Sequence, residues 1–121
     1  MASYHDIRIQ LGGDDGPPWF VIHRKDMILA IILREDLNPS INSNPAEVWV
    51  GAKEPLPEWG KRLAFKTTEV PLYVSPGEGM DYADRGTYRI IGNSNDATEI
   101  AAREAQPGIG KLSRIVFLKK A

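Results

Sequence analysis

The chain contains no cysteine, which excludes disulfides, thiolate metal ligands and cysteine nucleophiles together. It also lacks a long apolar run, because the longest, residues 27–33, is far shorter than the roughly 20 apolar residues that a membrane-spanning helix needs. No basic segment followed by an apolar stretch opens the sequence. We therefore expect an intracellular protein without a membrane partner, nuclear in a eukaryote and cytoplasmic in a prokaryote or a virus.

Histidine and net positive charge are scarce as well. His5 and His23 stand far apart without a third ligand at a spacing typical of zinc sites, so no metal site is expected. The sequence has no nucleophile elbow, Walker loop or dinucleotide fingerprint, and we predict neither a catalytic residue nor a cofactor. The net charge of −1 is unlike that of a non-specific DNA-binding protein, although basic residues cluster locally.

The remaining composition is typical of one soluble globular domain spanning residues 1–121, with 42% hydrophobic and 26% charged residues. Glycine and proline separate short apolar stretches, which indicates a β-rich fold. Six stretches have the length and composition of strands: residues 7–11, 19–22, 48–50, 70–74, 88–91 and 115–118. The continuous apolar run 27–33 suits a buried strand or a helix, and its β-branched isoleucines favour a strand.

Helices are predicted in two segments. Residues 96–105 can be capped by Asn95 or Asp96, have Glu99 at a capping-box spacing and are followed by Pro107. A second short helix is expected from Pro57 or the next residue through Leu63. The predicted fold class is α+β, mainly β, with one or two short helices.

The aromatic residues suggest a binding surface. Trp49 lies between Val48 and Val50, and strand alternation places it on the opposite face from these valines. If the valines face the core, Trp49 is displayed and can stack on a base; if Trp49 faces inward, it is a large core residue. Tyr82 lies in a loop rich in glycine and aspartate, where exposure is expected.

The order of several short motifs resembles the SRA (SET- and RING-associated) domain, a member of the wider PUA-like β-barrels. The resemblance covers about three quarters of the chain. Its motifs are the apolar run ending at Asp36, Val48-Trp49-Val50-Gly51, Lys61-Arg62-Leu63-Ala64, Val70-Pro71-Leu72-Tyr73-Val74, Tyr82 with Arg85-Gly86-Thr87-Tyr88-Arg89-Ile90, and the segment from Arg114 to Leu118.

This resemblance implies a compact twisted β-barrel that flips a methyl- or hydroxymethylcytosine out of DNA and stacks it between aromatic rings. Trp49 looks like one stacking position, and Glu35 or Asp36 falls where a carboxylate would bind the edge of the base. The chain differs from the family where Leu33 and Arg34 replace the second stacking aromatic, although a guanidinium plane can also stack.

The sequence and this resemblance therefore predict a reader of modified bases, with DNA favoured over RNA as its partner. Trp49, Glu35, Asp36 and Tyr82 are the predicted base-binding residues. The predicted phosphate contacts are Lys61, Arg62, Arg85 and Arg89. The competing prediction is a protein-interaction module, with Trp49 buried in a homodimer interface. A nucleic-acid-processing enzyme using Glu35 and Asp36 ranks third.

Overall fold

The computed structural model describes residues 2–16 and 19–121. In chain order, the elements are α1 (Tyr4–Leu11), β1 (Val21–Arg24), β2 (Met27–Arg34), the short 3₁₀ helix η1 (Pro39–Asn42), β3 (Ala46–Gly51), α2 (Leu56–Ala64), β4 (Val70–Ser75), β5 (Ala83–Ser94), α3 (Ala97–Glu104) and β6 (Leu112–Lys120). The predicted α+β, mainly β class is confirmed at this level.

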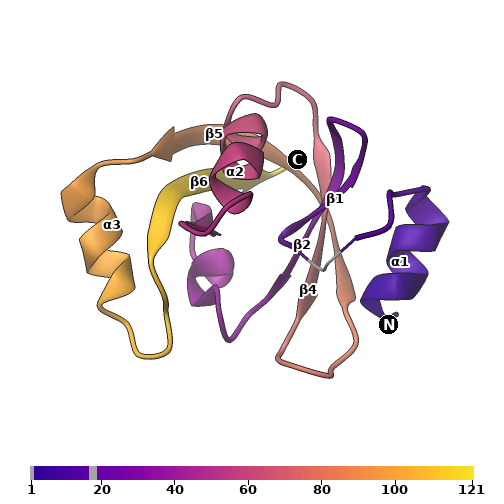
Figure 1. The fold of residues 1–121 in the computed structure, drawn as a ribbon, viewed down its shortest axis with the longest axis horizontal. Helices are drawn as coiled ribbons and strands as arrows, with labels where there is room; N and C mark the ends of the chain where they lie inside the picture. Colours follow the sequence, from indigo (N-terminus) through magenta and orange to yellow (C-terminus); the bar gives the residue numbers. More distant parts are fainter. Residues whose placement is uncertain (1, 17–18) are drawn as a thin grey trace.

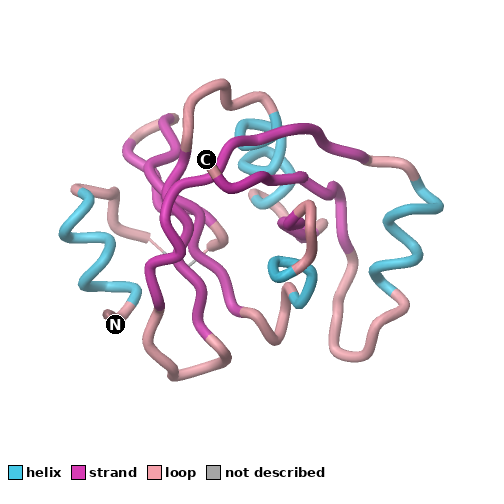
Figure 2. Tube along the Cα trace, turned by 180° about the vertical axis from the view of Figure 1, so that it is seen from behind, coloured by secondary structure: helices cyan, strands magenta, loops and turns pink. Residues whose placement is uncertain are grey.

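The strands form one sheet in the order β1-β2-β4-β5-β6-β3. β2 and β4 are parallel, and the other neighbouring pairs are antiparallel. The long strand β5 pairs with β4 through its first half and with β6 through its second half, so it links the two halves of the sheet. The sheet curls into a half-barrel (Figure 2), with β1 and β3 as its two edges.

The larger hydrophobic cluster contains residues from five strands and from α2. Val48, Val50, Leu63 and Leu72 in this cluster have no exposed surface. α2 lies over the curl (Figure 1), and it approaches β3 closely because it carries Gly60. A Cβ atom at this position would lie 2.5 Å from a methyl group of Val50, so glycine is needed for this packing.

The smaller cluster corrects one prediction. Residues 7–11, predicted as a strand, belong to helix α1, in which Ile7 is buried with Ile22, Ala30 and Ile32. The apolar and polar alternation was misleading, because Ile9 is 59% exposed. Ser3 accepts a hydrogen bond from the Asp6 backbone, and Gly12 ends the helix in the left-handed conformation (φ 73°). These caps were the signals missed in the sequence.

The number and bounds of other elements also differ from the predictions. The described residues form three α-helices and not one or two. The expected strand at 19–22 begins only at Val21, so Trp19 and Phe20 precede β1. The strand prediction for the run 27–33 is confirmed by β2, and both predicted helices are present as α2 and α3. The side chain of Asp96 caps α3 by accepting from the Glu99 backbone at 3.0 Å.

Candidate functional site

A pocket of about 240 Å³ lies between the two edge regions of the curled sheet, and we call it the aromatic pocket. Its aromatic lining comes from the segment before β1, from β3 and from the residue just before β5: Trp19, Phe20, Trp49 and Tyr82. Arg34 at the end of β2 and Asn38 before η1 supply polar groups, and aliphatic side chains complete the wall. The pocket therefore combines several rings with few polar groups, a composition typical of small-ligand sites.

Trp49 is a buried wall residue of this pocket and not a displayed platform, because it is only 6% exposed. Its indole Nε1 donates to the Glu47 carboxylate at 2.9 Å. Arg103 of α3 holds the same carboxylate through Nε and Nη2, each at 3.1 Å. Glu47 raises the pKa of Arg103 through this hydrogen bonding. The indole is consequently fixed in orientation by a carboxylate that is itself fixed.

Asn38 joins η1 to the edge strand β3. The side chain is 4% exposed, and its oxygen accepts from the Trp49 backbone N–H at 2.6 Å. Its amide nitrogen donates to the Glu47 carbonyl, also at 2.6 Å. The amide thus satisfies backbone groups on the outer edge of β3, the last strand of the sheet that the described residues form. Sequence reasoning treated Asn38-Pro39 only as a turn signal and missed this role.

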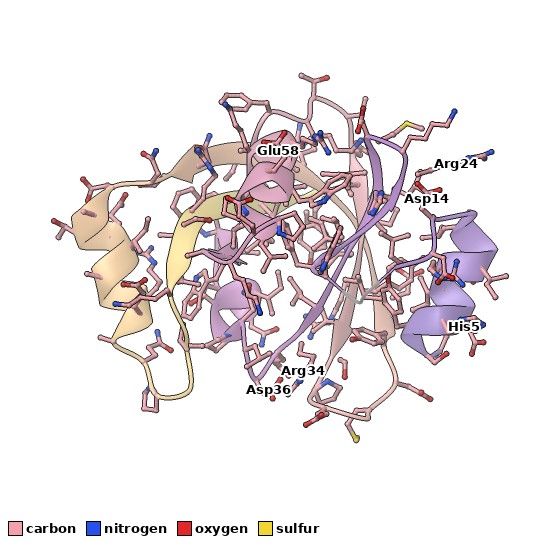
Figure 3. All side chains as sticks on the ribbon, in the orientation of Figure 1. His5, Asp14, Arg24, Arg34, Asp36 and Glu58 are labelled. Atoms are coloured by element: carbon pink, nitrogen blue, oxygen red, sulfur yellow. The ribbon has the colours of Figure 1, made fainter. Side chains whose placement is uncertain are left out.

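Arg34 lines the aromatic pocket, and Figure 3 shows it beside Asp36. Its Nε and Nη2 donate to the two carboxylate oxygens of Asp36 at 3.1 and 2.6 Å. This pairing lowers the pKa of Asp36 and raises that of Arg34. Within residues 2–16 and 19–121, no group accepts a hydrogen bond from the third nitrogen, Nη1. A ligand in the pocket would therefore meet a donor at Arg34.

The two predicted edge-binding carboxylates lie outside the lining of the aromatic pocket. Asp36 is exposed and paired with Arg34, whereas Glu35 accepts from the side-chain amide of Asn42. Tyr82 does line the pocket, and burial raises the pKa of its hydroxyl, which remains protonated at neutral pH. Of the four predicted base-binding residues, the structure brings together Trp49 and Tyr82.

A second pocket, also of about 240 Å³, lies on the other side of η1, and we call it the basic pocket. Its charged lining residues are Arg85, Lys119 and Lys120. Asn42, Ser43 and Asn44 contribute amide and hydroxyl groups. Of the predicted phosphate contacts, Arg85 alone lines this pocket.

The other predicted phosphate contacts do not gather with Arg85. Lys61 and Arg62 belong to α2, on the opposite side of the molecule from Arg34 and Asp36 (Figure 3). Arg62 pairs with Asp26 at 3.5 Å and with Glu58 at 3.4 Å. Arg89 is exposed on β5, in register with Lys119 on β6. The structure therefore distributes the predicted phosphate contacts over several surfaces.

His23 takes part in an aromatic stack that the sequence did not reveal. Its ring centroid lies 5.8 Å from that of Trp19, with nearly parallel planes, and 4.2 Å from that of Trp59. The guanidinium of Arg62 lies 4.5 Å from the centroid of the Trp59 ring. The stack supports Trp19, one wall of the aromatic pocket, and gives His23 a packing role.

Comparisons with known proteins do not add a function. No protein family model matches this chain, and no curated protein and no solved structure matches it significantly. The described residues contain no group of three potential metal ligands. They also contain no helix long and apolar enough to cross a membrane. The two pockets and the side chains that line them are therefore the features of this protein that point to a function.

Proposed function

We propose that this domain is an SRA/PUA-like reader of nucleic acid that receives a flipped modified base, of the methyl- or hydroxymethylcytosine type, in the aromatic pocket. The observation that carries the proposal is the lining, which combines four aromatic residues with one arginine whose Nη1 has no hydrogen-bond acceptor among the described residues. A volume of about 240 Å³ is below the roughly 300–1,000 Å³ of sites for drug-sized ligands. It suits a ligand of the size of a single base.

The energetics of flipping are compatible with such a pocket. Extruding a base costs a few kcal/mol, and each base stacked on an aromatic side chain recovers about 1–3 kcal/mol. Trp49 is held by Glu47, and Trp19 by the stack with His23, so these walls are already ordered before a ligand binds. Binding then loses little side-chain entropy, which increases affinity.

Arg34 is the side chain that best explains binding of the base edge. Cytosine presents acceptors at its ring nitrogen and carbonyl oxygen, and the free Nη1 of Arg34 can donate to either. Asp36 then acts by orienting Arg34 and does not contact the base itself. A methyl group at C5 would add apolar contact with the pocket walls. This arrangement differs from the edge-binding carboxylate that the family resemblance implies.

The competing proposals have less support. A dimer interface is not needed to explain the burial of Trp49, because one chain already covers all but 6% of it. Glu35 and Asp36 are engaged by Asn42 and Arg34 and do not line the aromatic pocket, which weakens a catalytic role for this pair.

The test is binding of fluorescent single-stranded and duplex DNA that carries cytosine, 5-methylcytosine or 5-hydroxymethylcytosine at one position. Affinity is measured by anisotropy, and flipping by the fluorescence of 2-aminopurine at the same position. Arg34→Gln removes the proposed edge donor. Arg24→Gln, exposed at the end of β1 and distant from Arg34 (Figure 3), removes the same charge elsewhere.

We expect preferential binding of one modified base and an increase in 2-aminopurine fluorescence. Arg34→Gln should weaken binding about tenfold or more, as expected for a lost charge-assisted hydrogen bond of about 1.5–3 kcal/mol. Arg24→Gln should change affinity far less. Absence of binding at low salt would reject the nucleic-acid proposal and favour the protein-interaction module. Equal losses in the two variants would show that Arg34 acts only through its charge.

A further inference from the structure

Positively charged side chains gather at one end of the paired strands β5 and β6. Arg89 and Lys119 are in register on these two strands, and Arg85 and Lys120 lie beside them in the basic pocket. No carboxylate among the described residues forms an ion pair with any of these four cations. Like charges opposite one another on a sheet are destabilising. An anion bound here would relieve this repulsion.

Two of these cations are held in place by neutral groups. Arg85 donates from Nη1 to the side-chain oxygen of Asn42 at 3.0 Å. The ammonium group of Lys120 donates to the Arg85 carbonyl and lies 5.2 Å from the centroid of the Tyr88 ring. Because these partners are neutral, both side chains keep their full charge for a ligand. Each also retains donors for further hydrogen bonds.

Gly86 makes the position of Lys120 possible. Its φ of +83° is in the left-handed region, and a Cβ atom there would lie 2.6 Å from the Lys120 ammonium. A larger residue would therefore be strained and would also displace the lysine. Asn42, Ser43 and Asn44 line the facing side with polar side chains, and no carboxylate among the described residues lines the pocket. The composition is that of an anion site with charged donors on one side and neutral polar groups on the other.

We propose that the basic pocket binds a phosphate group, with Arg85 and Lys120 as its principal ligands. η1 separates the two pockets: Leu37 and Asn38 before it line the aromatic pocket, and Asn42 at its end lines the basic pocket. A nucleic-acid strand that places a base in one pocket can place a backbone phosphate in the other. A backbone phosphate as the ligand rests on the proposed function. Binding of free phosphate does not depend on that function.

The first experiment titrates the full chain with inorganic phosphate and pyrophosphate while backbone and side-chain amide resonances are recorded by NMR. The variants Arg85→Gln and Lys120→Gln remove the proposed ligands. Lys61→Gln and Arg24→Gln, which change exposed cations outside the pocket lining and outside this group of four, are the matched controls. We expect saturable shifts at Asn42, Ser43 and Asn44 in the wild type and both controls, and their loss in the two pocket variants.

The second experiment measures DNA affinity over a salt series for the same proteins. Each lost phosphate contact should reduce the slope of log K against log salt by about 0.7 for single strands and about 0.9 for duplexes. A reduction in Arg85→Gln and Lys120→Gln, but not in the controls, supports a backbone phosphate as the ligand.

The two experiments separate the failure of one proposal from the failure of the other. Saturable phosphate shifts without DNA binding would retain the anion site, assign it to free phosphate and reject the nucleic-acid reader. DNA binding with unchanged slopes and no phosphate shifts would reject the anion site and retain the reader. Phosphate shifts of similar size around Lys61 and Arg24 would also overturn the proposed site, because they indicate binding to any exposed cation.

Discussion

The two pockets on either side of η1 have the same volume but use their polar groups in opposite ways. In the aromatic pocket, the Asn38 amide and the Trp49 indole N–H have protein partners, and Nη1 of Arg34 has no acceptor among the described residues and can donate to a ligand. In the basic pocket, Arg85 and Lys120 have neutral partners and retain their charge. The aromatic pocket is therefore suited to a ligand recognised by its shape, and the basic pocket to a ligand recognised by its charge.

The largest expected effect concerns the rigid wall of the aromatic pocket. Trp49→Ala should lower the free energy of unfolding by about 3–5 kcal/mol, since it leaves a cavity in place of a buried indole. Urea denaturation measures this loss. Trp49→Phe keeps most of the apolar volume but removes the hydrogen bond to Glu47, and it should be less destabilised. If Trp49→Ala is as stable as the wild type, the wall of the aromatic pocket is not rigid. The contrast between a pocket of fixed shape and a pocket of free charge is then wrong.

The next effect concerns the segment shared by both pockets. Asn38→Ala leaves the Trp49 N–H and the Glu47 carbonyl without their partner, and should cost about 1–3 kcal/mol of unfolding free energy. Because η1 is then less firmly attached to β3, ligand binding in both pockets should weaken. Ser40→Ala, within η1 and outside the lining of both pockets, is the control, and its stability should change by about 0.5 kcal/mol or less. Equal stability losses in the two variants would contradict the proposed role of Asn38.

The smallest expected effect is that of salt concentration on the affinity for a neutral nucleoside. A neutral ligand such as free 5-methylcytidine should bind the aromatic pocket with an affinity that changes less than about twofold between low and high salt, because it has no charge to screen. Arg85→Gln should leave this affinity unchanged, since Arg85 lines the other pocket. NMR titration measures both. A strong salt dependence of nucleoside binding would show that the two pockets are not chemically independent.

The sequence predicted elements where local signals agreed with the tertiary environment. β2, α2 and α3 were expected, and the Asp96 cap of α3 is confirmed. α1 was mistaken for a strand because alternating apolar residues outweighed the capping signals at Ser3 and Gly12. Tyr4 and Leu11 pack against the same cluster as the buried Ile7, and these three positions have the spacing of one helix face, a pattern that the alternation of residues 7–11 obscured.

The sequence also identified part of the aromatic pocket. Trp49 and Tyr82 were expected at a binding site, and both line the pocket. Trp19 and Phe20 were assigned to a strand, and Asn38 only to a turn, because their contributions depend on segments distant in the sequence. The carboxylates of Glu35 and Asp36 were expected at the base edge, but Arg34 lines the pocket while Asp36 pairs with it.

The sequence alone determined the mainly β class, because strand length, β-branched content and turn residues are properties of short segments. It also determined which side chains could stack or carry charge. The tertiary structure decided which of them meet. Curling of the sheet brings residues of β2 and of the edge strand β3 into one pocket, and pairing of β5 with β6 brings Arg85 near Lys120. Such contacts depend on the folding of the whole chain, and no local spacing encodes them.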